Sequence, residues 1–406
     1  MAFTLTQQPQ AYMPAYNPII YQGLSTNAGI SDFYYKVTVT DFISGQTAIY
    51  QINPRPDGYL LFDVSPFAQN YFINYIPINL YGLQYATESV RLLTVKIDEY
   101  YSGALHSGST YSFTAWNAAL SAEDFVDYNY LDYVFLDGSP FSTAVLTDSL
   151  NEITYEGRSN YWYYLASETQ YLYQTFIVKT YNEFGHLLGT TYLDDSQATN
   201  INYRQKYIAI DFGYKGMENI SPSVIVTGDY PIITPAVSYY TVTGSRTNAS
   251  AVVNLDLLKT YTIRCAEKSP VYSIHGLFDK GHFRSVHFPK VSEVTINSEK
   301  TTYNQIPFEN TANVWEYARR SAGEKILSVS ETKVIKLRTD WLSEDEIDLY
   351  SQLVTAPVSY LDDGGTDYLQ VIPVQNTYRK VKKFNKKLYA LELDYKYTLK
   401  SFKQRG

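Results

Sequence analysis

Along most of the chain, apolar and polar residues alternate with a period of two, the spacing of side chains on the two faces of a strand. The stretches Phe33–Thr40, Thr47–Ile52 and Ser89–Tyr100 show this most clearly. Turn-forming residues separate the stretches at intervals typical of β-sandwich domains, and no fixed-period repeat indicates a solenoid. The pattern predicts a mainly β protein of tandem β-sandwich-like domains, with one short helix in a C-terminal β-rich module.

That helix is expected over residues 343–355. Ser343 and Glu346 have the spacing of a capping box, in which a hydroxyl and a carboxylate satisfy the first free backbone amides. Pro357 ends the helix, because the residue before a proline avoids helical dihedral angles. The apolar face consists of Ile347, Tyr350 and Val354. We expect this face to cover a sheet or a neighbouring subunit, so Ile347 and Tyr350 are candidate interface residues.

A tight turn is expected at Pro56, Asp57 and Gly58. Proline presets the first dihedral angle, aspartate can bond its own backbone, and glycine takes the position that needs a positive φ. The turn should return the chain to the sheet at Tyr59.

The chain is expected to contain an extended arm and three β-rich parts. Pro9, Pro14 and Pro18 interrupt any regular ladder in the arm, whose Tyr12 and Tyr16 are candidate interface residues. Such an arm is either disordered or laid across a neighbouring subunit. The expected parts are 1–18 as the arm, 19–106 and 107–258 as two β-sandwich-like domains, and 259–406 as the C-terminal module.

The net charge and the tyrosine content of the chain bear on its possible partners. The 406 residues are 45% hydrophobic and carry a net charge of -8, which supports buried cores and argues against nucleic acid as the main ligand. The 42 tyrosines suit strands, and they are also favoured at protein interfaces. Both interpretations remain open.

Targeting and redox signals are weak. Cys265 is the single cysteine, so no intrachain disulfide is expected. The N-terminus has neither a basic region nor an apolar stretch typical of a secretory signal, and no segment approaches the roughly 20 apolar residues that span a bilayer. We expect cytoplasmic synthesis and no membrane insertion.

Candidate catalytic and metal-binding patterns do not combine into a motif. His275, His282 and His287 lie near Asp279 and Cys265 in sequence, and these are zinc-ligand residue types. Their spacing fits no compact metal motif, and no nucleophile elbow, phosphate-binding loop or dinucleotide fingerprint occurs. We expect no enzymatic activity, no metal and no cofactor.

The segment 122–133 combines Asp124, Asp127 and Asp132 with tyrosines. Carboxylates beside aromatic rings are compatible with a sugar-binding face, and glycosidases need two carboxylates at a set separation. A solvated loop explains the same residues.

The last residues are basic. Residues 376–406 hold ten Lys or Arg against Glu392 and Asp394. A phosphate contact, a contact with an acidic neighbouring subunit and a solvated strand face are the alternatives, of which we prefer the subunit contact. The candidate interface lysines are Lys382, Lys383, Lys386 and Lys387.

Five segments carry loose signatures that occur in a set order: 16–27, 53–71, 113–129, 274–288 and 339–361. Together they make the chain resemble a family of virion structural proteins of Bacteroidetes phages, including crAss-like phages. A departure occurs at His275–Asp279, where the resemblance implies a tighter Gly-Gly-Phe-Asp turn.

The resemblance implies a structural component of the tail, neck or collar, with no catalytic residues. We therefore expect a ring, collar or spike subunit of the tail or portal-vertex assembly, made in the host cytoplasm and located in the virion. Its expected partners are further copies of itself and other tail or portal-vertex proteins. The alternative is a tail fibre or adhesin that binds host surface glycans.

Overall fold

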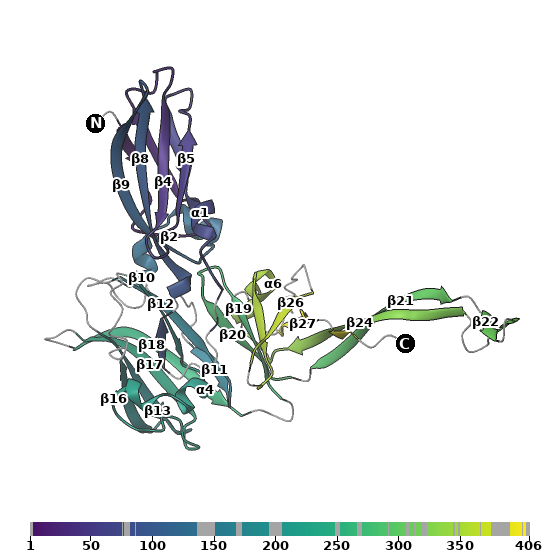
Figure 1. Cartoon of the computed structure of the whole chain (residues 1–406). Helices are drawn as coiled ribbons and strands as arrows, with labels where there is room; N and C mark the ends of the chain where they lie inside the picture. The colour runs from purple at the N-terminus through teal and green to yellow at the C-terminus, as the bar shows by residue number, and fades with distance from the viewer. Residues whose placement is uncertain are drawn as a thin grey trace, which may run out of the picture. The chain divides into compact units, whose positions relative to one another are not determined.

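The computed structural model is mainly β and consists of tandem β-sandwich-like domains (Figure 1). It divides into two compact units, one of residues 1–265 with 277–285 and the other of 266–276 with 286–406. The structure describes residues 3–74, 76, 82–85, 87–135, 151–167, 173–194, 205–247, 252–265, 270–290, 292–305, 308–311, 314–317, 323–343, 346–347, 350–365, 367–374, 390–399 and 401–402.

The first sandwich of unit 1 packs a five-stranded sheet against a three-stranded sheet. The residues of strand β4 alternate strictly between buried and half-buried positions, so one face of this strand packs into the core between the two sheets. The larger sheet has the order β2 (Tyr12–Pro14), β9 (Ala104–Trp116), β8 (Val90–Tyr101), β4 (Tyr34–Asp41), β5 (Thr47–Ile52). The smaller has the order β1 (Phe3–Gln7), β3 (Ile20–Ser25), β6 (Tyr59–Asp63). Tyr21, Tyr35 and Phe113 fill the core between them.

The N-terminal segment is part of this sandwich, whereas an extended arm was expected. β1 pairs antiparallel with β3, and β2 pairs in parallel with β9. The segment is ordered by non-local hydrogen bonds, because main-chain groups within residues 3–14 pair with strands up to about a hundred residues away in the sequence. The expected boundary at 106/107 falls inside β9, which belongs wholly to this sandwich.

The tight turn at residues 56–58 has the expected geometry. Gly58 has a φ of 80°, and its amide donates to the carbonyl oxygen of Arg55 at 2.8 Å. The Asp57 carboxylate accepts from the amide of Tyr59 at 3.1 Å.

The second sandwich of unit 1 joins a four-stranded and a six-stranded sheet. Trp162, Phe176, Phe212, Tyr240 and Tyr261 form an almost fully buried aromatic core. The smaller sheet has the order β10 (Val134–Phe135), β12 (Tyr161–Ser167), β15 (Gln205–Asp211), β7 (Leu83–Tyr85). The larger has the order β11 (Asn151–Tyr155), β18 (Val252–Arg264), β17 (Tyr239–Thr247), β13 (Tyr173–Tyr181), β14 (Leu187–Asp194), β16 (Ile225–Thr227). The expected boundary at 258/259 falls inside β18.

Short helical turns connect these strands. The α-helices are α1 (Ser65–Gln69), α2 (Ala122–Val126) and α4 (Tyr214–Glu218) in unit 1, and α6 (Gln352–Thr355) in unit 2. The 3-10 turns are η1 (Thr87–Ser89), η2 (Tyr130–Asp132) and η4 (Pro222–Val224).

Unit 2 is built on one large antiparallel sheet. Ile335, Leu337, Leu393 and Tyr395 line its buried face. The strand order is β20 (Phe283–Phe288), β19 (Tyr272–Leu277), β25 (Ser359–Asp362), β26 (Leu369–Pro373), β27 (Glu392–Tyr397), β24 (Gly323–Arg338), β21 (Glu293–Gln305), and β28 (Ser401–Phe402) also pairs with β24. A separate two-stranded sheet consists of β22 (Phe308–Thr311) and β23 (Val314–Tyr317).

The helical segment before β25 shows both hydrogen bonds of the expected capping box. The Ser343 amide donates to the Glu346 carboxylate at 2.8 Å, and the Glu346 amide donates to the Ser343 hydroxyl at 3.3 Å. Ile347 is buried and Tyr350 is half-buried, but Leu353 is the most deeply buried side chain of the segment. The covered face is therefore turned toward Leu353 relative to the expected one.

Candidate functional site

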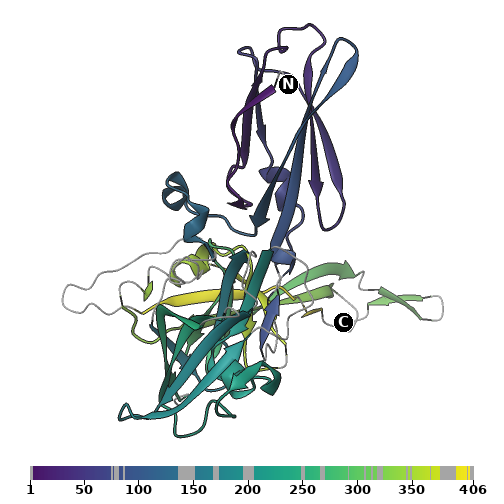
Figure 2. The ribbon, with the colours of Figure 1, turned by 90° about the vertical axis from the view of Figure 1, so that its left-hand side faces the viewer.

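Strands β21 and β24 of unit 2 form a long pair, which we call the ribbon. The two strands pair from Glu293 opposite Lys336 to Gln305 opposite Gly323, with one irregularity between Thr301 and Thr302. β27 and β28 pair with β24 only between residues 330 and 338. Beyond this base, the two strands run away from the rest of the sheet toward β22, as two views show (Figures 1 and 2).

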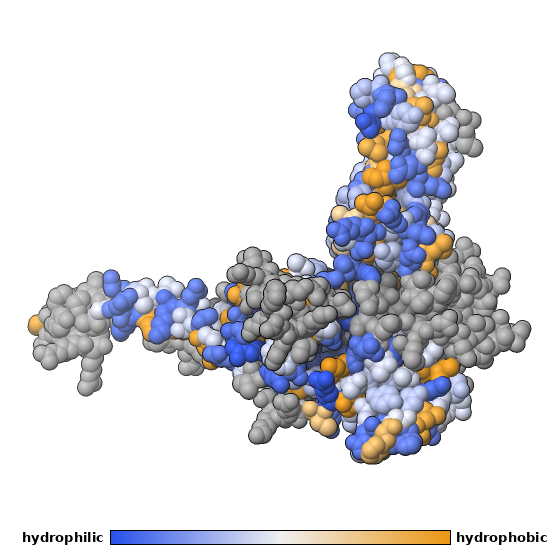
Figure 3. Space-filling model, turned by 180° about the vertical axis from the view of Figure 1, so that it is seen from behind, coloured by the Kyte–Doolittle hydropathy of each residue, from blue (hydrophilic) through white to orange (hydrophobic). Residues whose placement is uncertain are grey.

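Every residue of β21 from 293 to 304 is exposed. Among them are large apolar side chains: Val294 is 50% exposed and Ile296 is 57% exposed. Val294 lies opposite Ile335, which is fully buried. Since opposite residues of an antiparallel pair share a face, the buried face of the sheet continues onto the ribbon as exposed apolar surface. Figure 3 shows hydrophobic side chains among hydrophilic ones along it.

The base of the ribbon is held by charge. Glu392 on β27 contacts Lys336, and its second oxygen accepts from the Arg338 guanidinium at 2.7 Å. The hydrogen bond from Lys336 lowers the pKa of Glu392, and the same bond raises the pKa of Lys336. The contacts of Glu392 with Lys336 and Arg338 join β24 to β27, so they attach the base of the ribbon to the rest of the sheet.

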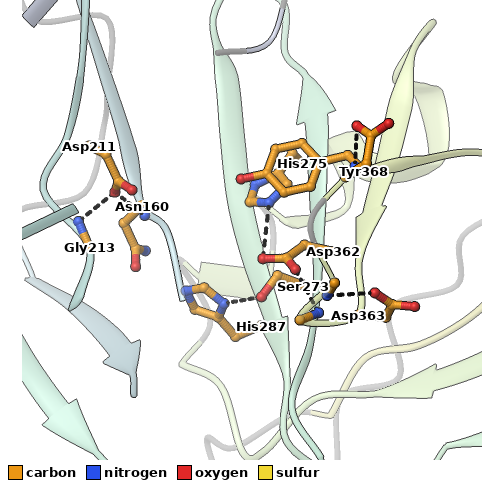
Figure 4. A network of polar contacts seen from close by, with 12 residues as sticks. Asn160, Asp211, Gly213, Ser273, His275, His287, Asp362, Asp363 and Tyr368 are labelled. Carbon is orange, nitrogen blue, oxygen red and sulfur yellow. Dashed lines mark hydrogen bonds and ion pairs between the residues drawn. The ribbon is translucent and has the colours of Figure 1, made fainter. Parts of the chain in front are cut away.

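A polar cluster in unit 2 gathers two of the histidines (Figure 4). The Ser273 hydroxyl lies 2.8 Å from Nδ1 of His287, while Nε2 of His275 lies 3.9 Å from the Asp362 carboxylate. In a catalytic triad the carboxylate orients the same histidine that contacts the serine. Here Asp362 pairs with His275, and Ser273 is fully buried. The cluster joins β19, β20 and β25.

Asp362 also shapes the turn that follows β25. One of its oxygens accepts from the Gly364 amide at 2.8 Å, and the ring of Tyr368 lies 4.7 Å from that of His275. The carboxylate thus connects the turn to the strand pair.

A second polar cluster lies in unit 1. Glu152 on β11 contacts Lys259 at 2.5 Å and Arg284 at 3.3 Å. The Lys259 ammonium also lies 5.1 Å from the centroid of the Trp162 ring, a cation–π distance. Burial, with the Arg284 charge second, lowers the pKa of His282 well below its usual value. His282 is therefore neutral at pH 7, and the Glu152 carboxylate is paired with two cationic side chains.

Asp211 is a buried carboxylate at the end of β15 (Figure 4). One of its oxygens accepts from the amides of Asn160 and Gly213, each at 2.8 Å. Burial raises its pKa to about 6, although both hydrogen bonds act in the opposite direction. The carboxylate fixes the start of α4 against β12.

The expected site residues fall in different places. Tyr12 is buried in β2 with its ring stacked on Tyr130, whereas Tyr16 is 47% exposed. Cys265 is exposed. In the part of the chain that the structure describes, no group of three or more His, Cys, Asp or Glu could hold a metal ion. The lysines at 382, 383, 386 and 387 lie outside the described residues.

The segment 122–133 holds its tyrosines inward. The Tyr128 hydroxyl donates to the Tyr12 carbonyl oxygen at 2.6 Å, and its ring packs between Phe125 and Tyr133. Burial raises the pKa of Tyr128 above its ordinary value. Asp124, Asp127 and Asp132 remain exposed. The tyrosines thus fasten the segment to β2, and this packing does not favour the glycan-binding interpretation.

Sequence reasoning did not identify the ribbon as a site. The sequence predicts strands at Val294–Ile296 and Ile326–Arg338, but we expected neither their pairing with each other nor their exposure. A usable signal is the composition of β21, where Thr, Val, Ile and Tyr favour a strand while polar residues occupy both faces. Such a strand has no side that must be buried.

Comparisons with known proteins give no family. No family model matches the chain, and no curated protein matches it. Among solved structures, the chicken CNTN1 FN1–FN3 domains align at 9% identity over 64% of this chain and 66% of that chain, just under two thirds of its length. The TM-score is 0.19, so the likeness carries no further argument.

Within the described residues, no helix has the length and apolar character that crossing a membrane requires.

Proposed function

We propose that the protein is a non-enzymatic structural subunit of a phage virion, a ring, collar or spike component of the tail or portal vertex that acts through protein–protein contacts. The sequence resemblance supplies the biological setting. The structural support is the ribbon, which exposes apolar side chains and, along the outer edge of β21, main-chain groups that pair with no other described strand.

The polar clusters support a structural role over catalysis. Glu152 contacts Lys259 and Arg284, the Ser273 hydroxyl contacts His287, and the Asp362 carboxylate contacts His275. Each cluster joins strands or turns of a single unit. Buried charges of this kind are kept where they are paired, so their presence needs no substrate.

The charge distribution supports assembly with further copies. The whole chain carries a net charge of -8, while residues 376–406 are basic. Complementary charges on two copies favour encounter in a defined orientation. We propose that this basic segment, which includes Lys382, Lys383, Lys386 and Lys387, contacts the acidic surface of a neighbouring subunit.

The test is to find the protein in particles. Mass spectrometry of purified virions of the encoding phage should detect the chain, and electron cryo-microscopy should locate it in several copies at the tail or portal vertex. Absence from virions, together with a monomeric protein at high concentration, would contradict the proposal.

A further inference from the structure

We infer that β21 is a docking edge on which a second copy of this chain places its own β21, antiparallel and about a twofold axis. The inference deepens the proposed function and rests on it, since it names the partner of the ribbon. The juxtaposition that carries it is a long, fully exposed edge strand on a ribbon of only two strands.

The outer edge of β21 is unprotected. Among the described strands it is the last in the sheet order, so nothing there pairs with its outer side. Natural edge strands are blunted by proline, by repeated lysines, by bulges or by being short. β21 runs from Glu293 to Gln305 with no proline and with Lys300 as its one lysine.

The irregularity of the ribbon does not disturb this edge. The register passes from Thr301 opposite Ser328 to Thr302 opposite Ile326. The extra residue is therefore Leu327, on β24, and β21 keeps its regular alternation. The main-chain N–H and C=O groups of β21 that point away from β24 form a continuous row that fits another extended strand.

Stability gives a second reason for a partner. A two-stranded antiparallel ribbon is marginally stable in water, and three or more strands are needed for independent stability. Between Thr301 and Gln305 the described pairing of β21 is with β24 alone. Joining two ribbons edge to edge produces four strands in the order β24, β21, β21, β24, without any other component.

Charge selects the register. A twofold axis perpendicular to the sheet keeps each side chain on its own face, so it passes midway between one residue and the same residue of the partner, which lie opposite each other. Axes at Glu299 or Lys300 set like charges opposite each other, and an axis at Ile296 sets Glu293 opposite Glu299. An axis at Ser298 pairs Glu293 through Tyr303 with no like charges directly opposite, and it is the longest such pairing.

The same register covers the apolar side chains. Ile296 then lies opposite the partner's Lys300, whose aliphatic stem can cover it, and Val294 lies opposite the partner's Thr302. The surface area that a single strand pair buries is smaller than the roughly 800 Å² per partner of a stable interface. The isolated dimer is therefore expected to be weak, and its assays need concentrations up to the high micromolar range.

Cysteine cross-linking tests the register in the full-length chain with Cys265→Ser as background. Ser298→Cys places two thiols opposite each other across the axis, where Cα atoms of antiparallel pairs lie about 4.5–5.5 Å apart, within the range of a disulfide. Thr302→Cys is the matched control, because it is exposed on the same face but lies opposite the partner's Val294. We expect a covalent dimer for Ser298→Cys under mild oxidation and a monomer for Thr302→Cys. Equal cross-linking at both positions, or none at either, would overturn the inference.

Charge exchange tests the twofold axis without covalent chemistry. Ser298→Lys and Ser298→Glu each place like charges opposite themselves, so each variant alone should dimerise several-fold more weakly than the wild type in sedimentation velocity. An equimolar mixture should restore association, because Lys then faces Glu. A mixture that associates no better than its components would contradict the register.

The two proposals fail separately. If the chain occurs in virions but does not self-associate through β21, the docking edge is wrong and the proposed function stands. If the dimer forms through Ser298 but the chain is absent from virions, the proposed function is wrong and the docking edge stands.

Discussion

At the scale of single residues, Asp211 gives the chain a defined pH dependence. Its pKa is about 6 in the folded protein against 3.8 ordinarily. Between these values the folded state holds a proton that the unfolded chain has released, so the free energy of unfolding falls as pH rises through this window and is level above it. A shift of this size corresponds to about 3 kcal/mol.

Asp211→Asn should remove that slope, since an amide oxygen can still accept from both amides. The measurement is the difference in unfolding free energy between variant and wild type, by denaturant titration at several pH values from 4 to 7. Asp127→Asn, at an exposed position, is the control. Parallel curves for wild type and Asp211→Asn would show that the carboxylate is not buried as described.

Gly281 is a residue whose side chain would have no room. Its φ is 80°, and a Cβ atom would lie 2.2 Å from the carbonyl oxygen of Asn117. Gly45 has a φ of 70° and nothing within 4 Å of the same position. Gly45→Ala therefore reports the cost of the backbone conformation alone, about 1–2 kcal/mol.

We expect Gly281→Ala to exceed this cost by at least about 2 kcal/mol, because main chain must move to make room. Thermal or denaturant unfolding of both variants measures the difference. Equal destabilisation would mean that the approach to Asn117 is looser than the structure shows.

At the scale of elements, the capping box of the C-terminal helical segment makes a separable contribution. Its two hydrogen bonds involve only Ser343 and Glu346. Ser343→Ala should cost about 1 kcal/mol of stability, and Glu346→Ala somewhat less. In a double-mutant cycle the two effects should not add, because each residue caps the other's amide. Full additivity would indicate that the reciprocal bonds do not form.

Elements held by neighbouring residues were predictable from the sequence. The capping box, the turn at Asp57 and the alternation of β4 all depend on side chains within a few positions of one another. The pairings of β1 with β3 and of β2 with β9 were not, because the ladders join residues far apart and no local pattern records them. The same holds for β18, whose two halves read as the end of one domain and the start of another.

The candidate site was less predictable than the fold. A buried pair such as Glu152 and Lys259 is separated by more than a hundred residues, and the sequence shows it only as isolated charges in apolar strands. The ribbon was not predicted as a site for a different reason. Its strands were predicted, but whether both of their faces are exposed depends on how the rest of the chain packs. The prediction placed Val354 on the covered helix face, whereas the structure buries Leu353. A pattern of apolar residues does not distinguish faces that differ by one residue.

At the scale of the whole molecule, the ribbon should be separable from the body that carries it. Lys300 lies opposite Val329, so residues 301–328 can be replaced by Asn-Gly, which closes a two-residue hairpin between these positions. The removed β21 residues 301–304 are exposed. We therefore expect the midpoint and slope of the main denaturant transition to stay within experimental error, while incorporation into particles falls, because only residues 296–300 of the 293–303 pairing remain.

Complementation of a phage that lacks the gene measures incorporation, by mass spectrometry of the purified virions. The matched control replaces the exposed turn residues Phe42 and Ile43 with Ser, which removes comparable apolar surface from another part of the chain. That control should be incorporated like the wild type if the ribbon is the assembly element. Normal incorporation of the shortened chain would place the assembly contacts elsewhere on the molecule, whereas a large loss of stability would show that the distal ribbon packs on the body after all.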